Sequence, residues 1–270
     1  MQPFHEQRIY QKDLKIMAGK SSQLRYLAHW HDEAEFLFVL NGRHTIGINE
    51  QKIAVKPGQI VQIGPWDIHY YENDDPISEA WLLIFSESLL GGRWLHRSGI
   101  WSVAQKASWE KMIELLENLA KETKTDNSHP DLAELSISGQ LLCLMAQVLL
   151  SQSDCFKPIH PSNRGGQISM HQVLTYITSH FQDEISRDDT ARHFGFSPAY
   201  FSRCFKAQTS LTFTEYITRF RLERAISLLK NSNQSIMDIA YQCGFNNSRT
   251  FHRAFRRIYS CQPRQIRELS

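Results

Sequence analysis

The pattern of hydrophobic and polar positions changes type along the chain. From residue 8 to about 85, short apolar runs alternate with turn pairs such as Asn41-Gly42 and Pro57-Gly58 at hairpin spacing, which predicts β-strands. Evenly spaced short strands indicate a small barrel or a double-sheet roll. From residue 108 onward the apolar positions recur at helical spacing. The pattern therefore predicts an α+β chain whose β part comes first.

Two helices are predicted directly after the strands, over residues 108–122 and 131–150. The second has an apolar stripe that contains Leu135, Leu142, Met145 and Leu149. A stripe of this kind beside a barrel suits a dimer interface, and burial against the chain's own barrel is the alternative. The segment 151–167 contains Pro158, Pro161, Gly165 and Gly166, and it is predicted to be a flexible linker.

The last hundred residues contain one pattern twice. Ala191 and Gly195 open the first copy, and Ala240 and Gly244 open the second copy 49 residues later. A small Ala lets another helix cross closely, and a Gly four residues later suits the left-handed conformation that ends a helix. Each copy thus reads as a helix, a tight turn and a second helix. The copies predict helix-turn-helix units at about 188–208 and 236–258.

The second helix of each copy has an apolar stripe and a basic face. Phe201 and Phe205 are four residues apart, as are Phe251 and Phe255, so the arginines between them point elsewhere. Two amphipathic hairpins with solvated charges would show the same stripe. Between the copies, residues 212–229 predict one continuous helix of about 27 Å, which is close to the roughly 34 Å between successive major-groove faces. One rigid helix could thus hold both copies on one side of a DNA duplex.

The charge distribution favours DNA over plain solvation. Residues 168–270 contain 14 Lys and Arg against 8 Asp and Glu, whereas the first 167 residues contain 16 against 20. Twelve of the 14 cations are Arg, whose planar fork matches phosphate oxygens and the edge of guanine. A basic half is therefore joined to an acidic one, and double-stranded DNA is the predicted partner of the basic half.

Specific positions in the basic half match a known family. The matching residues are Tyr176, Ile177, Ala191, Gly195, Phe196, Ser197, Phe205, Lys206, Tyr216, Arg221, Leu222, Ala225, Ile236, Ile239, Ala240, Gly244, Phe245, Phe251, Phe255, Pro263 and Arg267. With these marks, the stretch from Met170 to Arg267 resembles the DNA-binding domain of the AraC/XylS family of bacterial transcription regulators. The family usually has Gly at two turn positions where this chain has Ser210 and Cys261.

The resemblance implies which side chains meet DNA. The residues carried over for base contacts are Ala199, Ser202 and Arg203 in the first copy and Ser248, Arg249, Thr250 and Arg253 in the second. The residues assigned to phosphates are Lys206, Arg256 and Arg257. Phosphate contacts set the register without reading the sequence, so the two groups are expected to contribute differently to specificity.

The β region contains a histidine pattern of its own. The pattern is His29-x-His31-x3-Glu35-x6-Gly42, and later Gly58 followed by His69-x3-Asn73. This is the spacing of the two cupin motifs, so residues 1–85 resemble a cupin barrel. The Gly expected before His29 is absent, and the Pro of the second motif comes one residue late, at Pro65.

Two interpretations of the histidines are open. His29, His31, Glu35 and His69 offer three nitrogens and one oxygen, a set that suits Zn²⁺, Fe²⁺, Mn²⁺ or Ni²⁺. The preferred interpretation is an effector pocket without a cofactor, because regulators of this family often keep such histidines while binding organic ligands. A sugar or sugar derivative is the predicted effector, because aromatic faces stack on sugar rings. The residues assigned to the pocket are Arg25, His29, His31, Glu35, Trp66, His69 and Tyr71, with Trp30, Phe36, Tyr70 and Trp81 as further aromatic faces.

Together these features predict a ligand-controlled transcription regulator in the cytoplasm, with an effector-binding and dimerisation domain at 1–150, a linker at 151–167 and a DNA-binding domain at 168–270. A homodimer, activation of transcription and contact with RNA polymerase are expected, and a membrane span is not. An enzyme is not expected, because no catalytic set is recognisable beyond the barrel histidines; the alternative is a metal-dependent cupin enzyme fused to a DNA-binding tail. Effector binding is predicted to order residues 1–20 and so change how the two domains pack.

The five cysteines form no C-x-x-C pair, and no disulfide, zinc or redox role is assigned to them.

Overall fold

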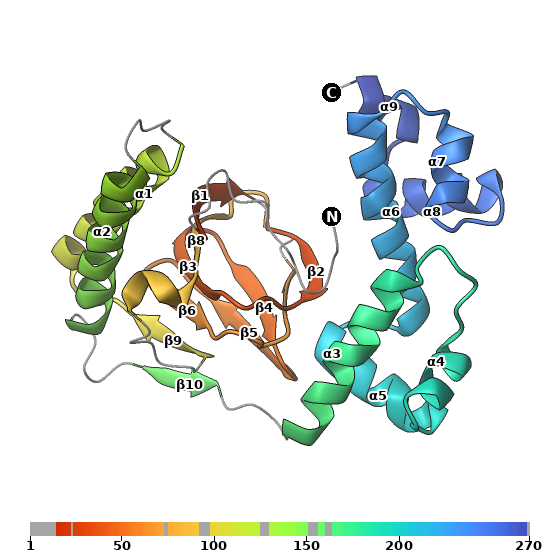
Figure 1. The fold of residues 1–270 in the computed structure, drawn as a ribbon, viewed down its shortest axis with the longest axis horizontal. Helices are drawn as coiled ribbons and strands as arrows, with labels where there is room; N and C mark the ends of the chain where they lie inside the picture. Colours follow the sequence, from red (N-terminus) through yellow and green to blue (C-terminus); the bar gives the residue numbers. More distant parts are fainter. Residues whose placement is uncertain are drawn as a thin grey trace. The chain divides into compact units, whose positions relative to one another are not determined.

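The computed structural model describes residues 15–22, 24–72, 75–91, 98–124, 130–150, 156–159 and 164–268. The chain divides into two compact units, residues 3–164 and 165–270 (Figure 1). The first unit contains the strands and two of the helices, and the second is helical. The predicted two-domain α+β fold is thus confirmed. Most of the segment predicted to respond to effector, residues 1–14, lies outside the described residues.

The strands of the first unit form two antiparallel sheets. The six-stranded sheet has the order β1 (Ile16–Ser22), β8 (Glu79–Phe85), β3 (Ala34–Asn41), β6 (Gln59–Ile63), β9 (Ser98–Ser102), β10 (Lys157–Ile159). The four-stranded sheet has the order β2 (Tyr26–His29), β7 (His69–Glu72), β4 (His44–Ile48), β5 (Gln51–Val55). The turn residues Gly42 and Gly58, which the sequence marked, have positive φ values of 68° and 82°.

Alternation along the strands separates two cores. Leu37 on β3 and Leu82 on β8 face the inner core between the sheets, together with Ile46 of the opposite sheet. Their neighbours Phe36 and Trp81 face the other way and pack in an outer core against helices. The first unit therefore has an interior lined by one set of side chains and an outer sheet face that needs a cover.

Two helices provide that cover. Helix α1 (Lys106–Glu122) and helix α2 (Pro130–Leu150) lie side by side against the six-stranded sheet, within two residues of their predicted bounds (Figure 1). A short 3₁₀ helix, η1 (Glu87–Leu90), also contacts α2. The side chains of α2 that enter the outer core are Ala133, Ile137, Leu141, Leu144, Met145 and Val148.

The opposite face of α2 is also apolar. Leu132, Leu135, Leu142 and Leu149 are 64%, 70%, 50% and 42% exposed. The predicted stripe therefore mixed two faces, because Met145 is buried while these leucines point outward. The window Leu132–Leu150 is long and apolar enough to cross a membrane by length and composition alone, and 33% of it is buried in the unit. Its inner face packs on the sheet, as in a core helix.

The segment predicted as a linker is ordered in part. Residues 157–159 form β10, whose Ile159 lies in the inner core, and helix α3 (Arg164–Ser179) already begins within the predicted linker. A flexible tether over the whole of 151–167 is therefore wrong. Strand β10 was not predicted from the sequence, because it has only three residues and one of them is Pro158. Proline is tolerated here because β10 is an edge strand.

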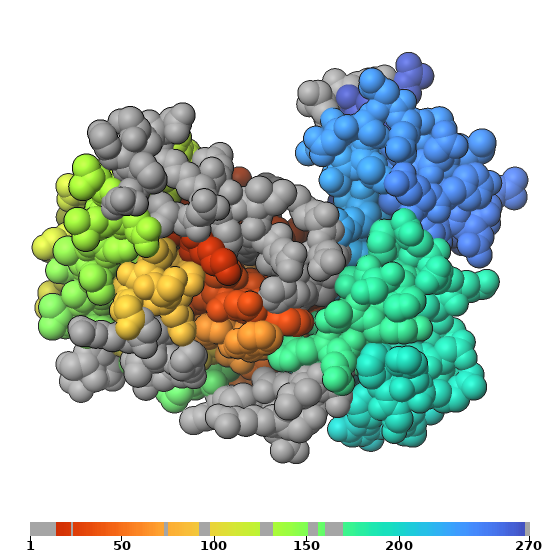
Figure 2. All heavy atoms as spheres, viewed as in Figure 1, coloured from red at the N-terminus to blue at the C-terminus, as the bar shows by residue number. Residues whose placement is uncertain are grey.

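The second unit contains both predicted helix-turn-helix units. After α3, its helices are α4 (Arg187–His193), α5 (Pro198–Thr209), α6 (Phe213–Asn231), α7 (Ile236–Gln242), α8 (Ser248–Tyr259) and α9 (Pro263–Glu268). The first motif is α4–α5 and the second is α7–α8, and α6 runs between them (Figure 1). Figure 2 shows the unit as two lobes, coloured green to teal and blue, that correspond to the two copies.

Polar side chains cap the second helix of each copy, and a left-handed serine ends it. Ser197 accepts from the Tyr200 amide with Pro198 at the first helical position, and Asn247 caps α8. Ser210, where the family usually has Gly, is left-handed at the end of α5, with φ 62°. In the second copy the left-handed residue at the end of α8 is Ser260, with φ 55°, one position before Cys261. Ser260 follows Ser210 by 50 residues.

Candidate DNA interface and candidate metal centre

The core of each helix-turn-helix unit is aromatic. Phe201 and Phe205 of α5 are fully buried and pack on Phe213, the first residue of α6. Phe251 and Phe255 of α8 are fully buried in the second copy. The predicted stripes are thus confirmed, and they fix which face of each second helix is left for other contacts.

The side chains predicted to meet DNA lie on the remaining faces. In the first copy Ala199, Arg203 and Lys206 are exposed and Ser202 is half-buried, with its hydroxyl donating to the Pro198 carbonyl at 2.8 Å. In the second copy Ser248 is half-buried, and the exposed residues are Arg249, Thr250, Arg253, Arg256 and Arg257. At about 100° per residue, those five share one face of α8. This face has four guanidinium groups against one arginine and one lysine on α5.

Helix α6 joins the two copies rigidly. Thr212 accepts from the Glu215 amide, and the Glu215 carboxylate accepts from the Thr212 amide at 3.0 Å, which forms a capping box. The Thr212 hydroxyl also donates to the Glu215 carboxylate at 2.7 Å. This bond and the bond from the Thr212 amide, with the nearby charges of Arg219 and Arg257, hold the pKa of Glu215 below its ordinary value. Seven side chains of α6 are buried in the unit, so the helix is anchored along its length.

The turns of the two copies differ in their surroundings. A Cβ atom on Gly244 would lie 2.6 Å from the Phe181 carbonyl oxygen and 2.9 Å from Nε of Arg221, whereas a Cβ on Gly195 would meet nothing within 4 Å. Arg221 donates to the Phe181 carbonyl at 2.7 Å and to the Asp183 carbonyl at 2.8 Å. Only the second turn is therefore docked on the segment that follows α3. Burial raises the pKa of the adjacent Cys243 thiol to about 11, which agrees with a packing role.

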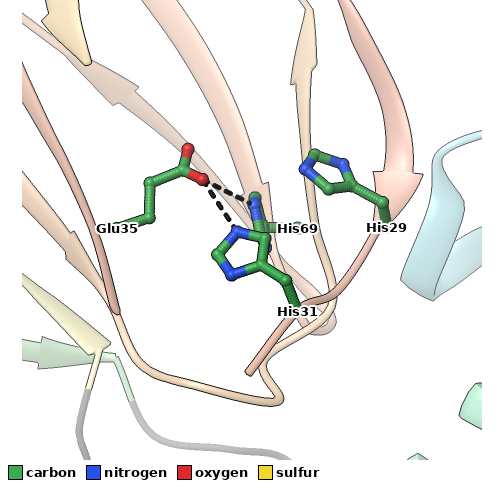
Figure 3. Close-up of side chains that lie close together, drawn as sticks. All are labelled: His29, His31, Glu35 and His69. Atoms are coloured by element: carbon green, nitrogen blue, oxygen red, sulfur yellow. Dashed lines mark hydrogen bonds and ion pairs between the residues drawn. The ribbon is translucent and has the colours of Figure 1, made fainter. Parts of the chain in front are cut away.

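Inside the first unit, the four residues of the candidate metal site converge from different strands. His29 on β2 lies opposite His69 on β7 in the four-stranded sheet, and His31 follows β2. Glu35 lies on β3 of the other sheet and faces the interior, like its neighbour Leu37. All four are buried, and their ligand atoms lie within 4.8 Å of one another. Figure 3 shows the rings of His31 and His69 directed at the Glu35 carboxylate, with His29 beside them.

Backbone carbonyls set which nitrogen of each histidine faces the centre. Nδ1 of His29 lies 2.8 Å from the Leu27 carbonyl oxygen, Nδ1 of His31 lies 2.9 Å from that of Glu33, and Nδ1 of His69 lies 2.9 Å from that of Asp67. A carbonyl oxygen only accepts, so each Nδ1 carries the proton and donates. In a neutral ring, Nε2 then presents its lone pair to the centre. Histidines that bind metals are commonly held in this way.

Two distances within the cluster, those from Glu35 to His31 and to His69, fit one cation. Nε2 of His31 and Nε2 of His69 lie 2.9 Å and 3.4 Å from Oε2 of Glu35. Two ligands each about 2.1 Å from a shared ion would be about 3.0 Å apart at a right angle and about 4.2 Å apart on opposite sides. The other carboxylate oxygen of Glu35 accepts a hydrogen bond from the Tyr71 hydroxyl. The donor set and its supporting hydrogen bonds thus fit a divalent transition metal ion.

The other residues predicted for the pocket are spread more widely. Tyr71 joins the cluster through Glu35, but Arg25 is exposed just before β2, and Trp66 is 54% exposed and stacked on Trp30 with ring centroids 5.0 Å apart. Phe36 and Trp81 pack in the outer core, so their assignment to the pocket is wrong. Tyr70 covers Gly47, where a Cβ would lie 1.9 Å from its ring. Alternation along β3, β7 and β8 could have separated these residues, had the strand bounds been known.

Two positions near the cluster were missed from the sequence. Tyr26 is 48% exposed, and its ring lies 6.1 Å from the rings of both His29 and Tyr71. Asp67 holds His69 through its carbonyl and anchors its own side chain to Asn49 and Ser98. Asp67 follows a Pro-Trp pair in a turn, and nothing in a single sequence distinguishes it from an ordinary turn residue.

Comparisons with known proteins agree with this organisation. Residues 190–269 match the model of a helix-turn-helix domain, and residues 14–85 match that of a cupin domain. Two helix-turn-helix units with exposed arginines, on a chain that also carries a cupin domain, define a DNA-binding transcription regulator. These matches support a regulator of the AraC type with a cupin domain at its N-terminus.

Full-length relatives have similar lengths and moderate identity. The chain is 28% identical over 257 residues to the HTH-type transcriptional activator RhaS of an Enterobacter species. The aligned region covers 91% of this chain and 89% of that protein. The chain is 29% identical over 259 residues to RhaS of Citrobacter koseri, with the same coverage. These relatives are regulators, so the matches point to regulation of transcription and not to an enzyme.

Among solved structures, the fatty-acid-bound ToxT of Vibrio cholerae overlaps 93% of both chains with 13% identity and a TM-score of 0.47. The AraC-type DNA-binding domain of a Chromobacterium violaceum regulator covers 39% of this chain with 28% identity and a TM-score of 0.37. Overlaps at this level add nothing to the conclusions about the fold or the site.

Proposed function

We propose that the protein is a cytoplasmic transcription activator whose first unit binds a small-molecule effector and whose second unit binds a DNA operator. The observation that carries the proposal is the arginine face of α8, exposed on a helix whose other face is fully buried. The RhaS relatives are transcriptional activators, which supports activation as the mode of regulation. Residues 1–150 would hold the effector and the dimer contact, and residues 168–270 the DNA contacts. An activator also requires contact with RNA polymerase.

The residues of α8 are proposed to divide base reading from phosphate binding. We expect Arg253→Ala to relax base preference by about 1–3 kcal/mol at one operator position, because a bidentate arginine discriminates between bases by that amount. Arg257→Ala should weaken specific and unrelated DNA alike and reduce the salt slope by about 1, because one phosphate contact is lost. Fluorescence anisotropy with operator and scrambled duplexes across a salt series measures both effects. If both variants behave alike, the division is incorrect.

The four-residue cluster is proposed to hold a divalent metal ion. The four residues each offer one ligand atom, and these atoms lie within 4.8 Å of one another, a grouping that could hold one metal ion. His29, His31, Glu35 and His69 would bind the ion, and when bound it would supply a Lewis-acidic centre for oxygen ligands. The effector would then lie beside the cluster and contact the ion through hydroxyl or carboxylate oxygens. A sugar or sugar acid has such oxygens, so the predicted effector class is kept, although its place differs from the predicted pocket.

The metal site also gives the alternative function its one supporting observation. A cupin enzyme fused to a DNA-binding unit would use the same four ligands. It predicts metal-dependent turnover that does not require DNA, whereas a regulator predicts a change in DNA affinity on ligand binding. Measuring both with one metal-loaded preparation and a panel of sugars and sugar acids separates the two.

The outer face of α2 is proposed to bind a second copy of the chain. Leu132, Gly139 and Ala146 recur every seven residues, and so do Leu135, Leu142 and Leu149 three residues after each. This is the spacing of a two-helix seam, with small residues that permit close approach. Each leucine buried contributes about 1.5–3 kcal/mol, and a symmetric pair buries it twice.

We expect Leu142→Glu to raise the dimer dissociation constant at least 100-fold, because it places two carboxylates in the seam. Ile77→Glu is the matched control, since Ile77 is an apolar residue outside α2 that is 65% exposed. Sedimentation equilibrium of the full chain measures both variants. A Leu142→Glu protein that remains as dimeric as Ile77→Glu would exclude this face as the interface.

A further inference from the structure

The candidate metal cluster is hydrogen-bonded to the Trp66-Asp67 segment, and Asp67 is bonded to Ser98 of β9, the strand that pairs with β10. We propose that occupancy of the cluster is transmitted through the Trp66-Asp67 segment and Ser98 to β10, the last strand before α3. The inference rests on the proposed function, because it assumes that an ion binds at the four ligands. It assigns a regulatory role to Asp67 and Ser98, which are not ligands.

The Trp66-Asp67 segment contacts two of the ligands through its backbone. The Trp66 amide donates to the His31 carbonyl at 3.0 Å, and the Asp67 carbonyl accepts from Nδ1 of His69 at 2.9 Å. Both histidines point Nε2 at the centre, so an ion that draws the two rings together displaces the backbone to which they are bonded. The segment is thus placed to respond to the ion.

The same segment is conformationally strained. Trp66 has φ 68°, which is rare for a bulky side chain, and its ring is held against Trp30. A residue kept in this region costs on the order of 1–3 kcal/mol and stays there only when its surroundings require it. Releasing or tightening the hydrogen bond to His31 therefore changes the balance between two backbone states.

The side chain of Asp67 carries the connection onward. One carboxylate oxygen accepts from Nδ2 of Asn49 at 2.9 Å, and the other accepts from the hydroxyl of Ser98. The Ser98 oxygen also accepts from the Gly64 amide at 2.9 Å. Ser98 and Asn49 are 2% and 1% exposed, so water competes little for these bonds. Any movement of Asp67 is thereby passed to the first residue of β9.

Strand β10 is paired with that part of β9. Ile159 lies opposite Ser98, and Pro158 lies opposite Gly99. The strand is fixed by Ile159 in the inner core and by Phe156, whose ring lies 4.5 Å from that of Trp101. A Cβ on Gly99 would lie 2.2 Å from the Phe156 ring, so the Gly permits this contact. Helix α3 begins at Arg164, five residues after Ile159.

A three-residue edge strand is suited to two states. It has few backbone hydrogen bonds, and Pro158 has no amide hydrogen to contribute, so β10 is held to β9 largely by the side chains of Ile159 and Phe156. A ligand shifts such an equilibrium only if it binds the two states unequally. The difference in ion affinity between the two states would come from the hydrogen bonds that join His31 and His69 to the Trp66-Asp67 segment. When β10 is released from β9, the unpaired segment that joins the two units becomes longer. When β10 pairs, that segment becomes shorter.

The test uses the full chain, stripped of metal with a chelator and then loaded with Zn²⁺. Metal content and Zn²⁺ affinity are measured separately from operator affinity with and without Zn²⁺. For the wild type we expect operator affinity to change at least fivefold on loading, within the usual range of coupling. Ser98→Ala should reduce this ratio to below twofold while Zn²⁺ affinity stays within threefold. Ser102→Ala is the matched control, because Ser102 lies on the same strand and bonds Gln59, away from the cluster.

Each result is decisive. If Ser98→Ala keeps the wild-type ratio, or if the loaded wild type shows no change in operator affinity, the connection through Asp67 and Ser98 is overturned while the metal site stands. If the wild type binds no ion, the proposed metal site is incorrect, and so is the proposed connection from it to β10. Gly99→Ala gives an independent check at β10, where loss of the Phe156 contact should also lower the ratio without loss of Zn²⁺.

Discussion

Gly244→Ala is expected to abolish tight operator binding by the full chain. The residue has φ 81°, and an added Cβ would lie 2.6 Å from the Phe181 carbonyl oxygen and 3.0 Å from Cα of Gln182. Both neighbours are backbone atoms, so the turn must move. The left-handed conformation costs about 1–2 kcal/mol for a residue with a Cβ, and the clash adds to it. We expect at least a tenfold loss of affinity, which corresponds to about 1.4 kcal/mol.

Gly195→Ala is the matched control for that variant. Gly195 has φ 73° at the corresponding turn, but an added Cβ meets nothing within 4 Å. The conformational cost is the same, so the difference between the variants isolates the contact with the segment after α3. Operator titrations and thermal melting of both proteins measure it. If both variants lose equal operator affinity and equal thermal stability, the contact of the second turn with the segment after α3 contributes no measurable free energy.

His31→Ala is expected to abolish stoichiometric metal binding. The wild type should bind one divalent ion per chain after dialysis, and the loss of one nitrogen from the four ligands should lower affinity more than 100-fold. Tyr71→Phe should lower it about 10–100-fold, because the hydroxyl orients Glu35 without touching the ion. Elemental analysis and melting with and without Zn²⁺ or Ni²⁺ measure these changes, since a bound ion stabilises the folded state.

His193→Ala serves as the control for histidine loss. His193 is exposed in the second unit and stacks on Tyr176, so its removal should leave metal binding unchanged. A wild type that binds no metal would favour the other account of the short distance between His31 and Glu35. In that account a protonated His31 donates from both nitrogens and forms an ion pair with the carboxylate.

Helix α2 shows what the spacing of apolar residues can and cannot predict. Its bounds followed from apolar spacing to within one residue, but its two faces did not. Leucines occur all around the helix, so a single stripe through Leu135 and Met145 joined an exposed residue to a buried one. Tertiary packing decided which face is buried, since the inner side chains of α2 share an outer core with α1, η1 and the six-stranded sheet.

The histidine cluster shows the same limit for a site. The four residues could be named from their spacing, because a cupin pattern is local in each of its two parts. Whether they meet around an ion or line a wider pocket depended on the pairing of β2 with β7 and on the distance between the two sheets. Residue types alone contain no such distance.

The sequence by itself determined the β-then-α order, the two helix-turn-helix units, the basic second half and the candidate ligands. All of these rest on local spacing, which a chain records directly. The tertiary structure alone decided the pairing of β10 with β9, the bonds that tie Asp67 to Ser98, the docking of Gly244 and the exposed face of α2. These depend on contacts between residues far apart in the chain, and such contacts are fixed only when the sheets and helices pack.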